Sequence, residues 1–341
     1  MNVLAIETSC DETSAAVVCD AEEPSQRILS NIINSQVDLH AKYGGVIPEY
    51  AARYHLDVID VIIEEAMQSA NVHFNDIATI AATVGPGLIG GLLVGTVTAK
   101  TISLATKTPF MAINHLEAHL LTARLCYDVA FPYLLLLASG GHFIIAEILG
   151  VANYKILGET LDDAAGECFD KVAKMLGLKY PGGPAIQNCA VNGDPRRFHY
   201  TIPLQKKCGC NVSFSGIKTA TKLHIDSIKN ITLQDKYDIA ASLQNVVVTF
   251  ITKQIERALE MTTSNPSNLV IAGGVAANLA LRNRLLTFAE RMGLHFWAPP
   301  VNLCADNAAM VAWCAIERIK AGFKHSDLRF PTRPRWPITE I

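Results

Sequence analysis

The feature that most restricts the fold of this chain is a pattern that occurs twice: an apolar strand, a short polar turn and a second apolar strand. The first copy joins residues 3–7 to residues 14–19, and the second joins residues 134–138 to residues 143–149. Each copy predicts a β-hairpin with a polar tip. The repetition predicts two related halves whose hairpin tips face a shared cleft, although hairpins are common enough that two unrelated hairpins would look the same.

The rest of the chain alternates strand-like runs with amphipathic helices, which is typical of an α/β protein. A chain of 341 residues is long enough for about two domains, each with its own core. Further strands are expected at residues 77–84, 110–114, 269–272 and 295–298, and helices at residues 48–69, 117–125, 164–176, 235–261, 277–292 and 306–321. Residues 182–184 and 192–215 are expected to form loops.

The composition excludes several classes of protein. Half of the residues are hydrophobic and 18% are charged, which argues against intrinsic disorder. The chain has no triplet glycine repeat and no sustained heptad, so it does not form a fibrous rod. The formal net charge is −3, so a nucleic-acid partner would need a local basic surface or one supplied by another subunit.

An uncharged stretch at residues 77–99 is long enough to raise the question of a membrane span. Gly85, Pro86 and Gly87 interrupt it with a turn signal, so we predict a buried strand, a tight turn and a glycine-rich helix. The nine cysteines form no C-x-x-C pair, and the N-terminus shows no signal-peptide pattern. We therefore expect a cytoplasmic protein with reduced thiols and no membrane segment.

His115 and His119 stand four residues apart, a spacing that places both rings on one face of a helix. Such a pair is more often structural than metal-binding. Two features favour a metal site: a predicted strand ends at Asn114, where α/β sites gather, and Asp306 stands at a helix start and can supply a third ligand. Two histidines and one carboxylate form an open ligand set used for iron(II) and catalytic zinc.

Zinc proteases also carry two histidines four residues apart on a helix. In the H-E-x-x-H motif the catalytic glutamate directly follows the first histidine. Here Glu117 comes two residues after His115, which turns it to the other side of the helix. Peptide hydrolysis is therefore poorly supported.

Two glycine-rich turns are candidates for binding a phosphate. Ser139, Gly140 and Gly141 lie between two strands and offer backbone N–H groups with no Cβ in the way, although Ser-Gly-Gly is also an ordinary turn. Residues 269–278 predict a buried strand, a Gly-Gly turn and a helix start, the layout of a nucleotide site or of a packing turn. Neither motif is a Walker A loop or a Rossmann fingerprint.

Acidic residues give weaker signals. Asp163, Glu167 and Asp170 recur at helical spacing and predict either a solvated acidic face or a carboxylate that accepts ribose hydroxyls. Asp11 and Glu12 lie at the tip of the first hairpin. They either orient or deprotonate a nucleophile, or only solvate the turn.

Six short motifs occur in order along the chain: AIETSCDET at residues 5–13, GPGL at 85–88, NHLEAH at 114–119, SGGH at 139–142, GGVAAN at 273–278 and DNAAM at 306–310. Together they resemble the TsaD family, the tRNA threonylcarbamoyladenosine transferases. The resemblance runs from Met1 to about Pro337. Six ordered motifs are specific where any one of them would not be.

The resemblance implies the fold of the actin, sugar-kinase and Hsp70 ATPase superfamily, with two RNase H-like lobes around a central nucleotide cleft. Residues 1–130 would form the first lobe, with a C-terminal helix at about 306–341 packing back on it, and residues 131–305 the second. It also implies the reaction. The threonylcarbamoyl group passes from threonylcarbamoyl-AMP to N6 of the adenosine beside the anticodon, in tRNAs that read codons beginning with A, and AMP leaves.

The same resemblance implies roles for individual residues. One divalent metal ion, iron(II) or zinc, would be held by His115, His119 and Asp306. The substrate's phosphate and acyl end would contact Leu137, Ala138, Ser139, Gly140 and Gly141, and its ribose and adenine would contact Asp170, Gly183 and Asn278. Asp11 or Glu12 would assist the exocyclic amine. The implied partners are tRNA, a TsaB-like paralogue and a TsaE-like ATPase, with the helix at residues 48–69 as an expected interface.

The chain departs from the family pattern at two places. Tyr50, Ala51 and Ala52 follow Pro48-Glu49 where the family has Leu-Ala-Ser, and Phe143 stands where a threonine is common. These departures bear on the partner or tRNA surface. The competing interpretations are an ATP-dependent small-molecule kinase or chaperone-like ATPase of the same superfamily, a non-catalytic binding scaffold, and a metalloprotease.

Overall fold

The computed structural model describes residues 1–204 and 209–341, which divide into two compact units. Unit 1 consists of residues 1–128 and 305–341, and unit 2 of residues 129–304.

Unit 1 is built on a five-stranded sheet of order β3-β2-β1-β4-β5. Its strands are β1 (Asn2–Glu7), β2 (Glu12–Cys19), β3 (Ile28–Ser35), β4 (Ile77–Gly85) and β5 (Phe110–Asn114). The first three form an antiparallel meander, and β4 and β5 add in parallel beside β1. Because alternate residues of a strand point to opposite faces, Leu4 and Ile6 pack into one hydrophobic cluster while the equally buried Val3 and Ala5 point to the other face. The predicted hairpin is confirmed.

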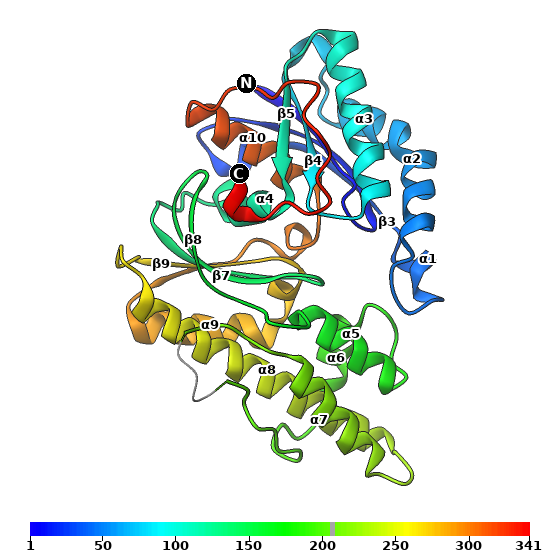
Figure 1. Ribbon diagram of the computed structural model, residues 1–341, viewed down its shortest axis with the longest axis vertical. Helices are drawn as coiled ribbons and strands as arrows, with labels where there is room; N and C mark the ends of the chain where they lie inside the picture. The colour runs from blue at the N-terminus through cyan, green and yellow to red at the C-terminus, as the bar shows by residue number, and fades with distance from the viewer. Residues whose placement is uncertain (205–208) are drawn as a thin grey trace. The chain divides into compact units, whose positions relative to one another are not determined.

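Four helices pack against this sheet: α2 (Pro48–Ser69), α3 (Ile89–Thr106), α4 (His115–Cys126) and α10 (Ala308–Lys320). The short helix α1 (Val37–Ala41) follows β3. In Figure 1, α2 and α3 lie side by side, and α10 packs against β1, β2 and β4. The C-terminal helix ends at Lys320, whereas the family resemblance implied a helix that continues to about residue 341. The chain beyond it runs along the sheet instead, where Ser326 N–H bonds to Phe110 O and Arg333 N–H to Val84 O.

Within the described residues, α3 is the one helix that is long and apolar enough to span a bilayer. It lies against β4, β1 and α2, and Gly91 and Gly95 allow it to approach Thr8 closely. This is the placement of a helix that covers a sheet.

Unit 2 repeats the topology of unit 1. Its strands are β6 (Tyr133–Ala138), β7 (Phe143–Gly150), β8 (Asn153–Glu159), β9 (Asn268–Ala272) and β10 (His295–Trp297), in the order β10-β9-β6-β7-β8. An antiparallel meander is again followed by two strands that add in parallel beside its first strand. The predicted duplication is therefore confirmed.

The third strand of each meander, β3 in unit 1 and β8 in unit 2, was not predicted from the sequence. Both have mixed burial along their length, and β8 carries the polar residues Asn153, Lys155 and Glu159. They are the edge strands of their sheets, and edge strands commonly carry polar residues that hide the strand signal.

The helices of unit 2 are α5 (Ala165–Met175), α6 (Gly182–Ala190), α7 (Ser215–Asp226), α8 (Leu233–Met261) and α9 (Leu279–Met292). The expectation of a loop at residues 182–184 is wrong, because these residues form the first turn of α6. Pro184 is tolerated there because N–H groups in the first turn have no acceptor within the helix. Helix α7 was not predicted. Short 3₁₀ turns complete the chain at Pro24–Gln26, Phe74–Asp76, Gly274–Ala277, Val301–Leu303 and Ile338–Glu340.

Candidate functional site

The end of β5 positions the two histidines in unit 1. Asn114 caps α4, since its Oδ1 accepts hydrogen bonds from the N–H groups of Leu116 and Glu117 at 2.9 and 3.3 Å. Its Nδ2 donates to Trp336 O at 3.0 Å, which ties the helix start to the C-terminal segment. His115 is therefore held in the first turn and His119 one turn later, with ring centroids 4.7 Å apart.

Asp306 reaches the same place from the other end of the chain. It precedes α10, whose N-cap is Asn307. Its Oδ1 lies 3.0 Å from His119 Nε2 and 3.5 Å from His115 Nε2. One ligand atom from each of His115, His119 and Asp306 lies within 4.8 Å of the others. The structure thus brings the three predicted metal ligands together.

This donor set fits a divalent transition metal. Two imidazole nitrogens and one carboxylate suit iron(II) or zinc and leave coordination positions open. Burial opposes a charge on His115, but Asp306 and Glu7 outweigh it and raise the pKa of His115 to about 9. His115 therefore holds a proton at neutral pH when no cation is bound, and a cation would replace that proton.

Glu7, at the end of β1, is a site residue that the sequence analysis did not single out. It is fully buried, and its Oε2 lies 3.1 Å from His115 Nδ1. Burial alone would raise the pKa of Glu7, but His115 and the hydrogen bond from Ser9 lower it. The signal available in the sequence was an acidic residue inside an apolar strand, because a buried charge requires a partner.

The tip of the first hairpin carries Asp11 and Glu12 and is held in place by α2. His55 of α2 hydrogen-bonds Thr13 Oγ1 at 2.8 Å and Cys10 O at 3.0 Å. Asp11 is buried at the tip. Burial first, and then the charges of Asp306 and Asp11, raise the pKa of Glu12 well above its usual value. This environment favours the protonated form of the Glu12 carboxyl.

Glu117 does not belong to this site. It is fully buried, and its Oε2 accepts a hydrogen bond from Arg318 Nε at 2.8 Å. The carboxylate that a zinc protease would need as a base is therefore committed to an ion pair with α10.

The predicted phosphate site lies at one edge of the unit 2 sheet. Gly140 and Gly141 follow β6, and Gly273 and Gly274 follow its parallel neighbour β9, so both turns meet at the same edge. Open space surrounds the position where a Cβ would stand on Gly140, Gly141 and Gly274. Gly273 has a φ of +87°, and a Cβ there would lie 2.5 Å from Ala138 O. The two turns form an open glycine cradle of the kind that binds anions.

The side chains of Leu137 and Ala138 are fully buried, so only their backbone can contact a ligand. The N–H of Gly166, at the start of α5, donates to Ser139 O at 3.2 Å. This contact ties the glycine cradle to α5.

Hydrogen bonds join the helices that carry or adjoin Asp170, Gly183 and Asn278. Asp170 Oδ1 accepts from Gly182 N at 2.7 Å, which locks α5 to α6, and Gly183 is open beside it. Gln187 of α6 accepts from Leu279 N at 2.7 Å, which locks α6 to the start of α9. The predicted ribose and adenine residues therefore share one corner of unit 2.

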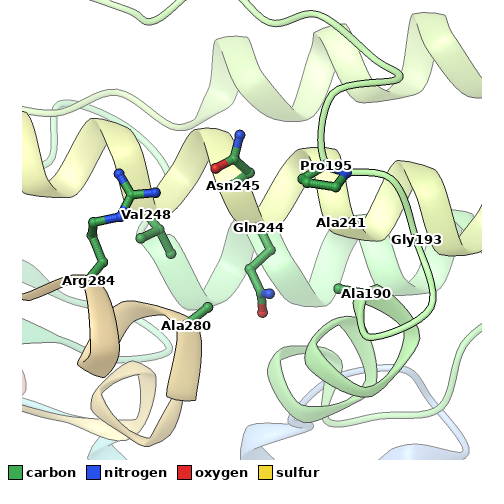
Figure 2. A pocket seen from close by; sticks show the side chains of 9 residues that line it. All are labelled: Ala190, Gly193, Pro195, Ala241, Gln244, Asn245, Val248, Ala280 and Arg284. Carbon is green, nitrogen blue, oxygen red and sulfur yellow. The ribbon is translucent and has the colours of Figure 1, made fainter.

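Asn278 caps α9 through Oδ1, which accepts from Leu281 N at 3.0 Å, and its Nδ2 donates to Gln244 Oε1 at 2.9 Å. Gln244 also lines a pocket of about 230 Å³ between α6, α8 and α9 (Figure 2). The polar side chains of this pocket are Gln244, Asn245 and Arg284. Gln187 and Gln244 were missed because a glutamine on a helix carries no distinguishing signal in the sequence.

Asp163, Glu167 and Asp170 do not share one helix, because α5 begins only at Ala165. Asp163 precedes the helix and pairs with Lys171 at 2.7 Å and Lys218 at 2.5 Å. Glu167 accepts a hydrogen bond from Ala164 N at 3.1 Å and so closes the first turn. Asp170 accepts a hydrogen bond from the N–H of Gly182, which precedes the open Gly183.

The departures from the family pattern have structural explanations. Phe143 is buried and packs edge-on against Phe214 with centroids 5.4 Å apart, so it serves the core of unit 2. Tyr50 is exposed and packs edge-on against Tyr43. The side chain of Ala52 lies where a Cβ on Gly90 would clash, which keeps α2 and α3 close.

Comparisons with known proteins identify the family of this chain. A family model described as "TsaD: tRNA N6-adenosine threonylcarbamoyltransferase" matches residues 27–313. Proteins named tRNA N6-adenosine threonylcarbamoyltransferase are similar over nearly their whole length. The protein from Paramagnetospirillum magneticum is 52% identical over 99% of this chain and 97% of its own, and that from Bartonella tribocorum is 50% identical over 100% and 96%.

Solved structures show the fold. The chain is similar to full-length HypF, with a TM-score of 0.61, 12% identity and coverage of 94% of this chain and 46% of HypF. A ROK family glucokinase from Streptomyces griseus gives a TM-score of 0.50 at 11% identity, covering 94% of this chain and 100% of its own. The predicted fold, that of the actin, sugar-kinase and Hsp70 ATPase superfamily, is confirmed.

Proposed function

Because this chain belongs to the TsaD family of tRNA N6-adenosine threonylcarbamoyltransferases, we propose that unit 1 holds its catalytic cation and unit 2 its acyl donor. The observation that carries the proposal is the convergence of His115, His119 and Asp306 within 4.8 Å. The cation is iron(II), with zinc as the alternative. The donor is threonylcarbamoyl-AMP.

The proposed reaction is an acyl transfer. The N6 amine of the adenosine beside the anticodon attacks the carbamoyl carbon of threonylcarbamoyl-AMP. The bond from that carbon to the phosphate oxygen breaks, AMP leaves, and the amine loses one proton. A cation, when bound, supplies positive charge that offsets the charge building on the carbamoyl oxygen and on the departing phosphate.

The residues of unit 1 prepare this site. His115 and His119 offer nitrogen ligands from one face of α4, and Asp306 adds a negative charge that favours a dication. Asp11 is proposed to receive the proton of the amine. Glu12 is less suited to that task, because its raised pKa favours the protonated form, which cannot accept the proton.

The residues of unit 2 are proposed to bind the nucleotide. The backbone from Leu137 to Gly141 would contact the phosphate and acyl end, since the glycines leave room for an anion beside their N–H groups. Asp170, Gly183 and Asn278 would contact the ribose and adenine from the corner where α5, α6 and α9 meet.

The set of metal ligands, two imidazoles and one carboxylate, argues against the competing enzymes of the same fold. Kinases and chaperone-like ATPases bind magnesium mainly through carboxylates, waters and phosphates, and two imidazoles suit magnesium poorly. The ion pair between Glu117 and Arg318 argues against a metalloprotease.

A TsaB-like paralogue and a TsaE-like ATPase are proposed as partners in the cytoplasm. The adjacent helices α2 and α3 support an interface with the paralogue, because they expose apolar side chains. These include Leu56, which is 66% exposed, and Val97, which is 58% exposed.

The test is reconstitution. The chain and its proposed partners are incubated with threonylcarbamoyl-AMP and unmodified tRNA, and the nucleosides are then analysed by mass spectrometry. We expect the modified adenosine from the wild-type chain, and the loss of both bound metal and product from His115→Ala. Full product from a variant shown to be free of metal would overturn the role of the cation.

A further inference from the structure

The two ring nitrogens of His115 have different surroundings. Nε2 faces Asp306 Oδ1 at 3.5 Å, on the side of the ligand cluster. Nδ1 faces Glu7 Oε2 at 3.1 Å, on the side of the sheet. The second histidine lacks this arrangement, because Nδ1 of His119 is buried and has no hydrogen-bond partner among the described residues.

We propose that Glu7 is a positioning residue that decides which nitrogen His115 offers to a cation. Glu7 holds a proton on Nδ1, so that the lone pair of Nε2 is directed toward Asp306 and His119. This inference rests on the proposed metal site and goes beyond it, because it assigns a role to a residue that touches neither cation nor substrate.

Glu7 can act in this way because it is fixed. Its Oε1 accepts a hydrogen bond from Ser9 N at 2.6 Å, and its Oε2 accepts one from Thr83 Oγ1 at 2.5 Å. It is fully buried on β1 and has no room to turn. A carboxylate without a proton is only an acceptor, so a ring nitrogen that faces it must carry the hydrogen.

The nearby hydroxyl of Ser9 does not make this choice. Its Oγ lies 3.2 Å from His115 Nδ1, close enough for a hydrogen bond. A hydroxyl can donate or accept, however, so it suits either form of the ring. Only Glu7 excludes an unprotonated Nδ1.

Glu7→Gln tests the proposal because it keeps the shape and changes the hydrogen bonding. If the amide oxygen accepts from Ser9 N–H, the NH₂ group faces His115 Nδ1. It then favours the tautomer in which Nδ1 is unprotonated and Nε2 carries the proton. If the amide is flipped, its NH₂ group faces the buried N–H of Ser9 and two donors oppose each other. Both arrangements weaken binding of a cation at Nε2.

The experiment measures the zinc dissociation constant of the full chain by competition with a chelator as a function of pH. The dissociation constants are compared at high pH, where they no longer change with pH. At lower pH a proton on His115 competes with zinc, and removing the Glu7 carboxylate also weakens the binding of that proton. We expect Glu7→Gln to bind zinc about 10–100-fold more weakly than the wild type. Thr83→Val is the matched control. It removes the other hydrogen bond to the same oxygen but keeps the carboxylate, and we expect it to bind zinc as the wild type does.

A measurement on the wild type covers the case in which Glu7→Gln does not fold. Long-range ¹H–¹⁵N spectra of the zinc-loaded, histidine-labelled chain report which nitrogen of His115 is protonated. A protonated Nδ1 supports the proposal, and zinc coordinated through Nδ1 overturns it. Equal affinity of the wild type and a folded Glu7→Gln overturns it as well. A wild type that binds no zinc or iron(II) removes the proposed metal site instead, so the two failures can be told apart.

Discussion

The two units contain the same hairpin at the same place in the same sheet topology, yet the tips of the two hairpins are built differently. In unit 1 the turn between β1 and β2 is packed with side chains, and Thr8 and Ser9 are almost fully buried. In unit 2 the turn between β6 and β7 contains Gly140 and Gly141, which are exposed and open. One tip is a set of oriented side chains, and the other is bare backbone.

The difference follows from the charge of the proposed ligand. A cation requires lone pairs, which side-chain imidazoles and carboxylates supply, and these side chains must be held in place by neighbours such as Glu7. An anion is bound by N–H groups, which the backbone already carries, and side chains would only block it. The same sheet topology can thus carry a cation site beside one hairpin and an anion site at the other, because different residues surround the two tips.

The largest effect is expected when the carboxylate is removed from the cation site of unit 1. Asp306→Ala should lower product formation about 1,000-fold, because several kcal/mol of charge stabilisation would be lost. AMP affinity, which depends on unit 2, should be unchanged in calorimetry. Asp327→Asn, which alters an acidic residue of unit 1 that pairs with Arg329, is the control and should keep full activity. A loss of AMP affinity in Asp306→Ala would show that the sites are not separate.

The second prediction concerns the pH dependence of cation binding in unit 1. The pKa of His115 is raised to about 9 in the metal-free protein. Its proton therefore stabilises the fold fully below about pH 6.5, and that contribution is lost as the pH rises through 9. A cation must displace this proton, so zinc affinity should increase about tenfold per pH unit and level off near pH 9. Titrations at several pH values check this, and a flat profile between pH 7 and 9 would contradict it.

The third prediction places a side chain on the bare tip. Gly140→Val should weaken AMP binding about 10–100-fold, because the new side chain occupies the space of the phosphate and costs hydrogen bonds to a charged group. Zinc affinity should not change. Gly216→Ala fills open space on exposed α7 and serves as the control. Unchanged AMP affinity in Gly140→Val would remove the glycine cradle from the nucleotide site.

The smallest effect concerns the acidic pair at the first tip. Glu12→Gln should change the transfer rate by less than about threefold, because the raised pKa of Glu12 favours the protonated carboxyl, which an amide resembles. Asp11→Asn should lower the rate about 100-fold if Asp11 receives the proton of the amine. Single-turnover rates with tRNA decide between them. A larger loss for Glu12→Gln than for Asp11→Asn would reverse the assignment.

Much of this architecture was predictable because it is local. Helix α2 and strand β5 begin and end at the expected residues, since hydrophobic periodicity and the proline at the helix start are visible in a short window. The pairing of His115 with His119 was predictable for the same reason. The edge strands β3 and β8 were not, because their polar residues match the exposed rim of a sheet and not its centre.

The amino-acid sequence by itself determined which groups are available: two histidines on one helix face, glycines after two strands, and six motifs in a specific order. Only the tertiary structure decided how these groups are used. It brings Asp306 to residues almost 190 positions earlier, buries Glu7 against one nitrogen of His115, and commits Glu117 to Arg318. Periodicity describes neighbours along the chain, whereas ligand geometry, burial and the protonation that follows from them depend on residues that meet only after folding.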